Sequence, residues 1–407
     1  MVDPISLRHH RPFVHFWCAR VATTIAYQIA TVAVGWKVYE LTGSALALGL
    51  IGLVQFVPVV LFTLIVGHVA DRYDRRQVVR VSQLTEAAAT LFLAVGSAGD
   101  WLTPGVLFAI VFVTGSTRAF VLPSIHALLP ALVPTGLFSR AVAGSASANQ
   151  TAIIIGPALG GLLYLAGPAV AFAASSAIFG VAALLTSLIR LDQARQARAP
   201  LSLQLLLSGI AFIRGRPAIL GAISLDLFAV LLGGATALLP IYARDILETG
   251  PWGLGLLRSA PALGALAASL VLARYPLKSG VGRTLFASII AFGAATVVFG
   301  LSRSLPLSLA ALAALGAADA VSVVIRFSLV QMRTPDEMRG RVSAVNSMFI
   351  GASNTLGEFE SGITAAWLGA VPAVLLGGTG TILVALLWMR MFPDLRRMDR
   401  LEMARRE

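Results

Sequence analysis

Charged residues are scarce in this sequence. Asp, Glu, Lys and Arg together make up 12% of its 407 residues, against about 25% in a typical soluble domain. A single cysteine, Cys18, excludes an internal disulfide and any cluster of thiolate ligands around a metal. The five histidines form no set with paired acids or with a nucleophile, so the sequence does not predict an enzyme. No nucleotide-binding loop of the form GxxxxGK[ST] is present, which argues against direct coupling to ATP. We therefore expect no cofactor and no metal.

Hydrophobic residues, in contrast, make up 57% of the chain and gather in long uninterrupted runs. A run of about 20 apolar residues is the length that crosses the hydrocarbon core of a membrane as a helix. The sequence thus predicts an all-α membrane protein with twelve transmembrane helices. Their expected ranges are 13–40, 44–70, 77–98, 102–125, 141–165, 168–189, 217–243, 252–274, 282–302, 305–327, 342–366 and 370–391.

The basic residues lie mostly on one side of these expected spans. Of 31 Lys and Arg residues, 24 fall in the termini and in the connections on the same side as the termini. Only Lys37, Arg244 and Arg303 fall on the other side. Because cytoplasmic connections retain positive charge, we predict that both termini are cytoplasmic and that the protein lies in the inner (cytoplasmic) membrane. The net charge of +12 follows from this topology, and no basic helix interleaved with aromatic residues indicates nucleic acid binding.

The N-terminus does not have the pattern of a cleaved signal. The opening residues, MVDPISLRHHRPF, are polar, and the first apolar run is longer than the hydrophobic core of a signal peptide. We expect the first span to remain in the mature protein.

An internal repeat divides the twelve expected helices into two sets of six. At an offset of 201 residues, VPTGLFSRAVAGSASANQTAIIIGPALGG aligns with TPDEMRGRVSAVNSMFIGASNTLGEFESG. Such repeats are typical of membrane transporters. The aligned pairs are Pro134 with Pro335, Arg140 with Arg341, Gly156 with Gly357 and Gly161 with Gly362.

We therefore predict two pseudo-symmetric six-helix bundles, residues 1–189 and residues 217–407, the second with a basic cytoplasmic tail. A cytoplasmic linker, residues 190–216, joins them. It contains the amphipathic stretch LSLQLLLSGIAFI, which we expect to lie along the membrane surface.

One short connection, GHVADRYDRR, concentrates two aspartates and three arginines between two apolar runs. Retention of positive charge in a cytoplasmic loop explains the arginines but not the glycine or the aspartates. A functional interpretation assigns the glycine to close helix contact and the first aspartate to backbone hydrogen bonds at a helix start. The residues of this loop motif are Gly67, Asp71, Arg72, Arg75 and Arg76.

This connection resembles the signature loop of the major facilitator superfamily, although Asp74 stands where that family usually has glycine. The run GPALGG in the fifth expected helix resembles the antiporter motif of the same family. Longer stretches, including GRVSAVNSMFIG, are similar to the drug-efflux branch that contains the bacterial enterobactin exporter. The residues of the GPALGG motif are Gly156, Pro157, Gly160 and Gly161.

The resemblance covers nearly the whole chain and implies two six-helix halves around a central cavity, working by alternating access. It also implies that Asp71 bridges toward the eleventh helix as a cytoplasmic latch. The second half has lost the aspartate from its copy of the loop, ASLVLARYPLKSG, so a symmetric second latch is not expected.

Eight ionisable residues fall inside the expected spans, where each costs roughly 2.5 kcal/mol or more. Four of them, on the first, fourth, seventh and tenth helices, are expected to act in gating or coupling. These are Arg20, Arg118, Asp226 and Asp319. One interpretation is that the two cations of the first half pair with the two acids of the second half. The other is that each charge is paired within its own half. The remaining four are Glu86, Arg326, Glu358 and Glu360.

Glu358 and Glu360, in the run GEFESG, occupy the place of the fifth-helix motif in the second half. Two residues apart on a regular helix, they point to nearly opposite faces and cannot address one ligand together. Either one of them acts in coupling or substrate binding, or both form a polar patch near the outer membrane surface.

Taken together, these patterns predict a secondary transporter. The expected function is proton-coupled export of a small amphipathic molecule, either drug-like or a siderophore. The alternatives are a lysophospholipid or lipid translocator of the same fold and a transport-incompetent membrane sensor. The expected partners are the small-molecule substrate, protons and membrane lipids, with the protein acting as a monomer.

Overall fold

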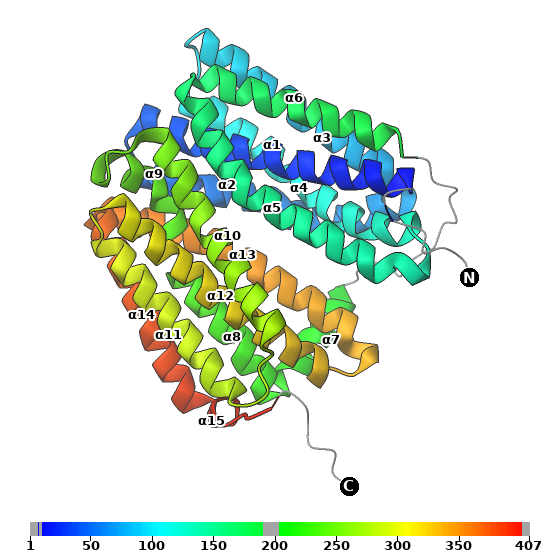
Figure 1. Ribbon diagram of the computed structural model, residues 1–407, viewed down its shortest axis with the longest axis vertical. Helices are drawn as coiled ribbons and strands as arrows, with labels where there is room; N and C mark the ends of the chain where they lie inside the picture. Colours follow the sequence, from blue (N-terminus) through cyan, green and yellow to red (C-terminus); the bar gives the residue numbers. More distant parts are fainter. Residues whose placement is uncertain (1–6, 8–9, 190–202, 401–407) are drawn as a thin grey trace. The chain divides into compact units, whose positions relative to one another are not determined.

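The computed structural model describes residue 7 and residues 10–189 and 203–400, and all regular structure in these residues is helical (Figure 1). Within these ranges, the side chains of residues 63–72, 122, 126–127, 135 and 203–206 lie outside the described part. The elements are α1 (Arg11–Thr42), α2 (Ala45–Arg72), α3 (Arg75–Ala98), α4 (Pro104–Leu132), η2 (Thr135–Leu137), α5 (Phe138–Leu165), α6 (Pro168–Ser187), α7 (Leu203–Arg214), α8 (Pro217–Leu232), η3 (Ala235–Leu238), α9 (Leu239–Ile241), η4 (Tyr242–Ile246), α10 (Gly250–Arg274), α11 (Val281–Leu301), α12 (Leu305–Arg333), α13 (Asp336–Leu368), α14 (Ala370–Met391) and α15 (Pro393–Arg396).

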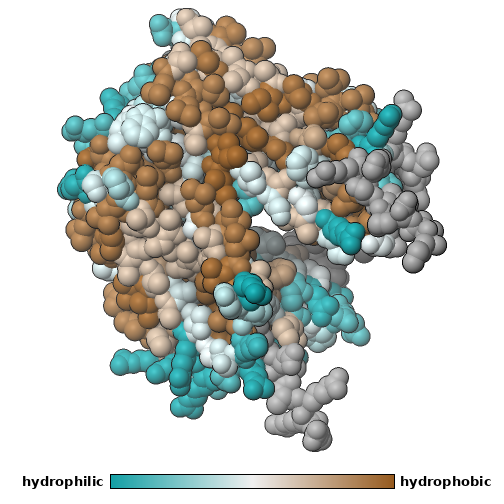
Figure 2. All heavy atoms as spheres, in the orientation of Figure 1, coloured by the Kyte–Doolittle hydropathy of each residue, from teal (hydrophilic) through white to brown (hydrophobic). Residues whose placement is uncertain are grey.

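Ten helical segments in the described residues are long and apolar enough to cross a membrane. The helices α1 and α13 are long enough, at 32 and 33 residues, but their composition keeps them outside this set. Large apolar side chains such as Leu91, Leu162 and Leu383 are more than half exposed along the spans, as lipid-facing residues must be. Figure 2 shows this hydrophobic surface along the helices, with hydrophilic residues gathered near α15.

The chain divides into two compact units that exchange short segments. Unit 1 comprises Met1–Gly43, Val54–Pro200 and Gly250–Ser259, and unit 2 comprises Ser44–Leu53, Leu201–Thr249 and Ala260–Glu407. The start of α2 therefore packs with the C-terminal helices, and the start of α10 packs with the N-terminal helices. Each of these two helices belongs to both units.

In unit 1, α1 packs against α5 and α6, and α3 packs against α4 and α6. A core at one end of these helices gathers apolar side chains from α1, α3, α4 and α5, with Phe16, Leu128 and Ala141 among them. At the other end, α1 stops at Gly43, whose φ of 57° is the left-handed conformation that glycine adopts without steric cost.

In unit 2, α11 packs against α12 and α14, while α8 packs against α13 and α14. The core joins α8, α11, α12 and α14 through residues such as Leu225, Phe286 and Leu329. The sequence predicts one helix over 217–243, but the structure breaks it after α8 at Gly233 and Gly234 and continues as η3, α9 and η4. A Cβ at Gly234 would collide with the carbonyl of Gly357 on α13, so this break allows close contact between the two segments.

The helix α7 forms within the predicted linker and packs against α13. Gly209 lies so close to α13 that a Cβ there would stand 3.0 Å from Cγ2 of Val345. Arg341 of α13 donates a 3.3 Å hydrogen bond to Ser208. Ile213 joins Val345 in a small core. The amphipathic stretch thus has one face on protein, while Leu207 is 64% exposed.

Candidate functional site

The most densely charged buried cluster of the described spans lies in unit 2. Arg326 of α12 forms an ion pair with Asp226 of α8, and its other terminal nitrogen lies 3.8 Å from a carboxylate oxygen of Asp319. The side chains of Arg326 and Asp226 are 9% and 8% exposed, whereas that of Asp319 is 44% exposed. One arginine is therefore shared between a buried acid and a partly exposed acid.

The geometry of α12 places this cluster on one face of the helix. Asp319, Ser322 and Arg326 follow one another at intervals of three and four residues, which brings them to the same side. The Nε of Arg326 donates to the hydroxyl of Ser322 at 3.0 Å and to its carbonyl at 3.3 Å. These bonds hold the guanidinium while its outer nitrogens face the two acids.

The sequence pattern assigns no partner to Arg326, yet it is the residue that brings the two predicted acids together. Its spacing from Asp319, seven residues or two helical turns, is a signal that points to a shared face. Nothing in the sequence, however, indicates that α8 places Asp226 against the same guanidinium, because that contact depends on helix packing.

The two predicted cations of unit 1 have neighbours within unit 1. Arg20 of α1 donates a 2.9 Å hydrogen bond to the hydroxyl of Ser145 on α5. The guanidinium of Arg118, on α4, stacks 3.9 Å above the ring of Tyr27, a cation–π contact. The hydroxyl of Tyr27 in turn accepts a 2.8 Å hydrogen bond from Gln55. Pairing of these arginines with Asp226 or Asp319 stays a prediction.

The two glutamates of α13 have different neighbours. Glu360 accepts a 2.7 Å hydrogen bond from the hydroxyl of Thr364, one turn further along the helix. Glu358 lies over Gly52 at the start of α2, because a Cβ at Gly52 would stand 2.7 Å from its Oε2. The two carboxylates therefore take part in separate contacts.

The GPALGG motif of α5 brings two different helices close to α5. Gly156 and Gly160 face α1, and a Cβ at Gly160 would stand 3.0 Å from the Cα of Ile29. Gly161 faces the start of α10, where a Cβ would stand 3.2 Å from the Cα of Gly255. In return, a Cβ at Gly255 would stand 2.5 Å from the carbonyl oxygen of Pro157. The backbone of α5 can approach those of α1 and α10 this closely because glycine has no side chain.

The loop motif is described only in part. The side chains of Gly67, Asp71 and Arg72 lie outside the described residues. Arg76 forms an ion pair with Asp74 at 2.7 Å and donates a 2.9 Å hydrogen bond to the carbonyl of Ile189. The carboxylate of Asp74 also accepts a 2.9 Å hydrogen bond from the backbone N–H of Arg76, so it caps α3. Asp74, which departs from the family pattern, thus stabilises the start of α3.

Replacing Asp74 with alanine is expected to lower the free energy of unfolding by about 1 kcal/mol, because the cap of α3 is lost. Asp74→Asn keeps an oxygen that can accept the same hydrogen bond. We expect it to change the free energy of unfolding by only about a few tenths of a kcal/mol. Thermal unfolding of the purified protein, followed by tryptophan fluorescence, measures both. An alanine variant as stable as the parent would contradict the capping role.

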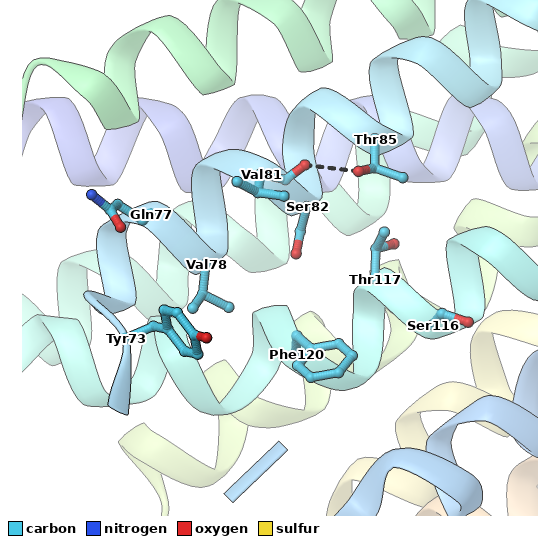
Figure 3. Close-up of a pocket in the computed structure, with 9 residues that line it drawn as sticks. All are labelled: Tyr73, Gln77, Val78, Val81, Ser82, Thr85, Ser116, Thr117 and Phe120. Atoms are coloured by element: carbon cyan, nitrogen blue, oxygen red, sulfur yellow. Dashed lines mark hydrogen bonds between the residues drawn. The ribbon is translucent and has the colours of Figure 1, made fainter. Parts of the chain in front are cut away.

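A cavity of about 400 Å³ lies between α3 and α4 (Figure 3). Beside it, the buried acid Glu86 of α3 accepts a 2.9 Å hydrogen bond from the hydroxyl of Thr117 on α4. The sequence gives no sign of this cavity. The residues that line it are Tyr73, Gln77, Val78, Val81, Ser82, Thr85, Ser116, Thr117 and Phe120.

The described residues contain no group of three or more His, Cys, Asp or Glu side chains that could hold a metal ion. The chemistry in the described spans is that of ion pairs, hydroxyl groups and closely packed glycines.

Ten apolar spans among the described residues, with an ion-pair cluster between two of them, indicate a multi-pass membrane protein. A family model described as a transmembrane secretion effector, within the major facilitator superfamily, matches residues 4–407. The chain belongs to this family of transporters, whose members are not enzymes.

Curated relatives match over almost the whole chain. Macrolide efflux protein A of Streptococcus pyogenes is 25% identical over 405 residues, covering 95% of this chain and 97% of the relative. Enterobactin exporter EntS of Citrobacter koseri is 25% identical over 397 residues, covering 96% and 94%. These matches confirm the predicted similarity to the efflux branch of the superfamily.

Solved structures show the same fold at low sequence identity. A mutant of the nucleoside transporter NupG superposes with a TM-score of 0.77 at 15% identity, covering 94% of this chain and 100% of that one. A bacterial homologue of the iron transporter ferroportin superposes with a TM-score of 0.72 at 16% identity, covering 93% and 98%. The predicted major facilitator fold is confirmed, whereas a full count of twelve crossings stays a prediction.

Proposed function

We propose that this protein is a proton-coupled exporter of a small amphipathic molecule and that it works by alternating access. The observation that carries the proposal is the cluster of Asp226, Arg326 and Asp319 inside two spanning helices. Ionisable groups within a membrane are costly and mark the paths of protons and ions. The names of the curated relatives, which are efflux and export proteins, support the outward direction.

Within the cluster, we assign the coupling proton to Asp319. Two carboxylates and one guanidinium sum to one negative charge, so binding of one proton makes the cluster neutral. Asp226 is buried against Arg326, whereas Asp319 is the more exposed acid and lies further from the guanidinium. A proton arriving from solvent therefore reaches Asp319 first, and its binding leaves Arg326 wholly to Asp226. Alternation between these two states links protonation to the packing of α8 and α12.

The other predicted residues take supporting roles in this proposal. We assign gating to Arg20 and Arg118 on α1 and α4, and assign Glu358 and Glu360 to coupling or substrate contact on α13. The loop motif serves as the cytoplasmic latch, with Asp71 as its acid. The GPALGG motif, from Gly156 to Gly161, serves as the packing point of α5.

The remaining features of the proposal concern place and partners. The excess of arginine in the connections supports an inner-membrane location with both termini in the cytoplasm. The protein acts as a monomer among membrane lipids, with a small molecule and protons as its other partners. Because relatives are named for macrolides and for enterobactin, these two compounds are the first substrates to test.

Replacing Asp319 with asparagine is expected to reduce proton-driven export on the order of tenfold or more, a typical size for a coupling between two sites. The reason is that the amide cannot take up a proton, while substrate exchange without a gradient should persist. Proteoliposomes loaded with a pH-sensitive dye measure substrate-dependent proton flux, with macrolide, enterobactin and a lysophospholipid as separate arms. Parent protein that moves substrate without any proton flux would refute the proposed coupling.

The matched control is Asp336→Asn. Asp336 lies at the start of α13, is 86% exposed and pairs with Arg339 at the same helix end. Its replacement removes the same charge outside the cluster, so it should leave both export and proton flux unchanged. If Asp319→Asn behaved like this control while the parent coupled protons, another acid would carry the proton. Preference for the lysophospholipid arm would favour lipid translocation over drug or siderophore export.

A further inference from the structure

The cavity between α3 and α4 is polar in composition but apolar in the surface that it presents. Five hydroxyl-bearing residues line it. Two of them donate a hydrogen bond to a carbonyl of their own helix, Thr85 to Val81 at 2.9 Å and Ser116 to Phe112 at 2.7 Å. The hydroxyl of Thr117 lies within hydrogen-bond distance of the carbonyl of Thr114, at 2.8 Å, and of Glu86, at 2.9 Å. The donors of these three hydroxyls are thus occupied, and the surface that faces the cavity is mostly apolar.

Apart from Gln77, Ser82 and the hydroxyl of Tyr73, the rest of the wall is apolar. Figure 3 shows Tyr73 and Phe120 facing the same space, with Val78 between them. A wall made mostly of rings and methyl groups, with three of its five hydroxyls hydrogen-bonded, suits a hydrocarbon chain better than a hydrated polar ligand. The helix α3 itself is one of the candidate membrane spans, so such a chain is available from the bilayer.

A second pocket, of about 190 Å³, lies at the start of α3 and is polar. It is lined by the cap residue Asp74, by Arg76 and Arg80, and by residues at the end of α6. Arg76 is held by Asp74 and by a backbone carbonyl. Arg80 is exposed and forms no ion pair with any described residue. Gln77 lines both pockets, so they lie on either side of this residue, the first toward α4 and the second toward the end of α6.

Charge and position together identify the occupant. Among the described residues that line the polar pocket, two arginines against one aspartate leave one net positive charge, which favours an anion. The guanidinium fork matches the oxygens of a phosphate group. A phosphate bound to Arg80 would lie near the start of α3, next to a cavity suited to a hydrocarbon chain. One molecule with both groups, a negatively charged head and an apolar chain, fits the two pockets at once.

We propose that the start of α3 is a binding site for an anionic phospholipid, whose phosphate contacts Arg80 and whose acyl chain lies in the cavity between α3 and α4. The proposal does not depend on the transported substrate. The arginine-rich connection suggests in general that lipid binds there, and the proposal places that contact at Arg80.

The test measures binding of phosphatidylglycerol and phosphatidylcholine with identical chains to the purified full-length protein by native mass spectrometry. The parent is expected to bind phosphatidylglycerol about fivefold more tightly, the size of effect that one arginine near a membrane surface provides. Arg80→Gln should abolish this preference. Arg303→Gln, which removes an exposed arginine from another connection, should preserve it.

A second pair of variants tests the cavity. Val81 lines the cavity and is 57% exposed, so Val81→Trp fills its mouth without disturbing the core. It should weaken binding of both lipids. Leu91→Trp, at a position 52% exposed further along α3 and outside the cavity, should have no effect.

Three outcomes would overturn the assignment. Equal affinity of the parent for the two lipids would remove the role of charge. Unchanged binding in both Arg80→Gln and Val81→Trp would place the lipid elsewhere. Binding of soluble glycerol 3-phosphate as tight as that of phosphatidylglycerol, and insensitive to Val81→Trp, would identify a free phosphate ligand instead of a lipid.

Discussion

Replacing Arg326 with glutamine is expected to destabilise the protein by about 3–5 kcal/mol, the usual cost of leaving a buried charge without its partner. Asp226 is buried on α8 and forms its ion pair with Arg326 alone among the described residues. Without the guanidinium, its carboxylate must either remain charged in an apolar surrounding or take up a proton. The cost is smaller for the carboxylate of Asp319, because 44% of its side chain is exposed.

The measurement is the thermal unfolding midpoint of the purified protein in detergent. A loss of this size should lower the midpoint by on the order of 10 °C. The double variant Asp226→Asn/Arg326→Gln removes both charges while keeping volume and hydrogen-bonding groups, so it should recover most of the loss. A single variant as stable as the parent, or a double variant no better than the single, would contradict the proposed dependence of Asp226 on Arg326.

The comparison of these two variants also separates stability from transport. The double variant is expected to fold but not to couple protons, because Asp319 has lost the arginine that it shares with Asp226. A folded protein that still drives export with a proton gradient would show that the cluster serves only to satisfy buried charge.

The spans themselves follow from the sequence because each apolar run has the length of a bilayer. The expected range 370–391 coincides with α14, and 282–302 differs from α11 by one residue at each end. The break after α8 is harder to predict from the sequence. Gly233 and Gly234 permit it, but glycine pairs also occur in continuous membrane helices where they serve packing. Only the contact with α13 decides between these possibilities.

For the charged residues, too, the sequence predicts one part of the site and helix packing determines the other. Burial cost alone marks Asp226 and Asp319 as residues that need partners. Which cation satisfies them depends on how α8 and α12 pack together, and Arg326, on the helix of Asp319, contacts both acids. For the loop motif, the resemblance to the family's signature loop implies a latch, whereas Asp74 acts locally as a helix cap.

The internal repeat predicts one further feature of the structure, namely that Gly161 and Gly362 occupy equivalent places. In unit 1, Gly161 of α5 meets Gly255 of α10. In unit 2, Gly362 of α13 meets Gly49 of α2, where a Cβ on Gly49 would stand 2.8 Å from the Cα of Gly362. Each contact joins a helix of the first six to a helix of the last six. The repeat identifies the glycines, but not the helices that approach them.

The close contact between α5 and α10 depends on the absence of a side chain at Gly255. Replacing Gly255 with alanine is expected to reduce transport by about 5- to 150-fold. The new Cβ would stand 2.5 Å from the carbonyl oxygen of Pro157 and 3.1 Å from the Cα of Ala158, both on α5. Overpacking of this kind costs about 1–3 kcal/mol. If the contact forms and breaks in each cycle of alternating access, this cost falls on one state alone and lowers its population by the same factor.

The matched control is Gly180→Ala on α6, where a Cβ would meet no other atom within 4 Å. Alanine has the higher helix propensity, so this variant should be at least as stable as the parent and transport at the same rate. Uptake into inverted vesicles, normalised to folded protein measured by fluorescence-detected gel filtration, distinguishes a blocked cycle from a loss of folding. Normal transport by Gly255→Ala would mean that α5 and α10 tolerate a wider separation. The contact between their glycines would then be a consequence of packing and not a requirement of the transport cycle.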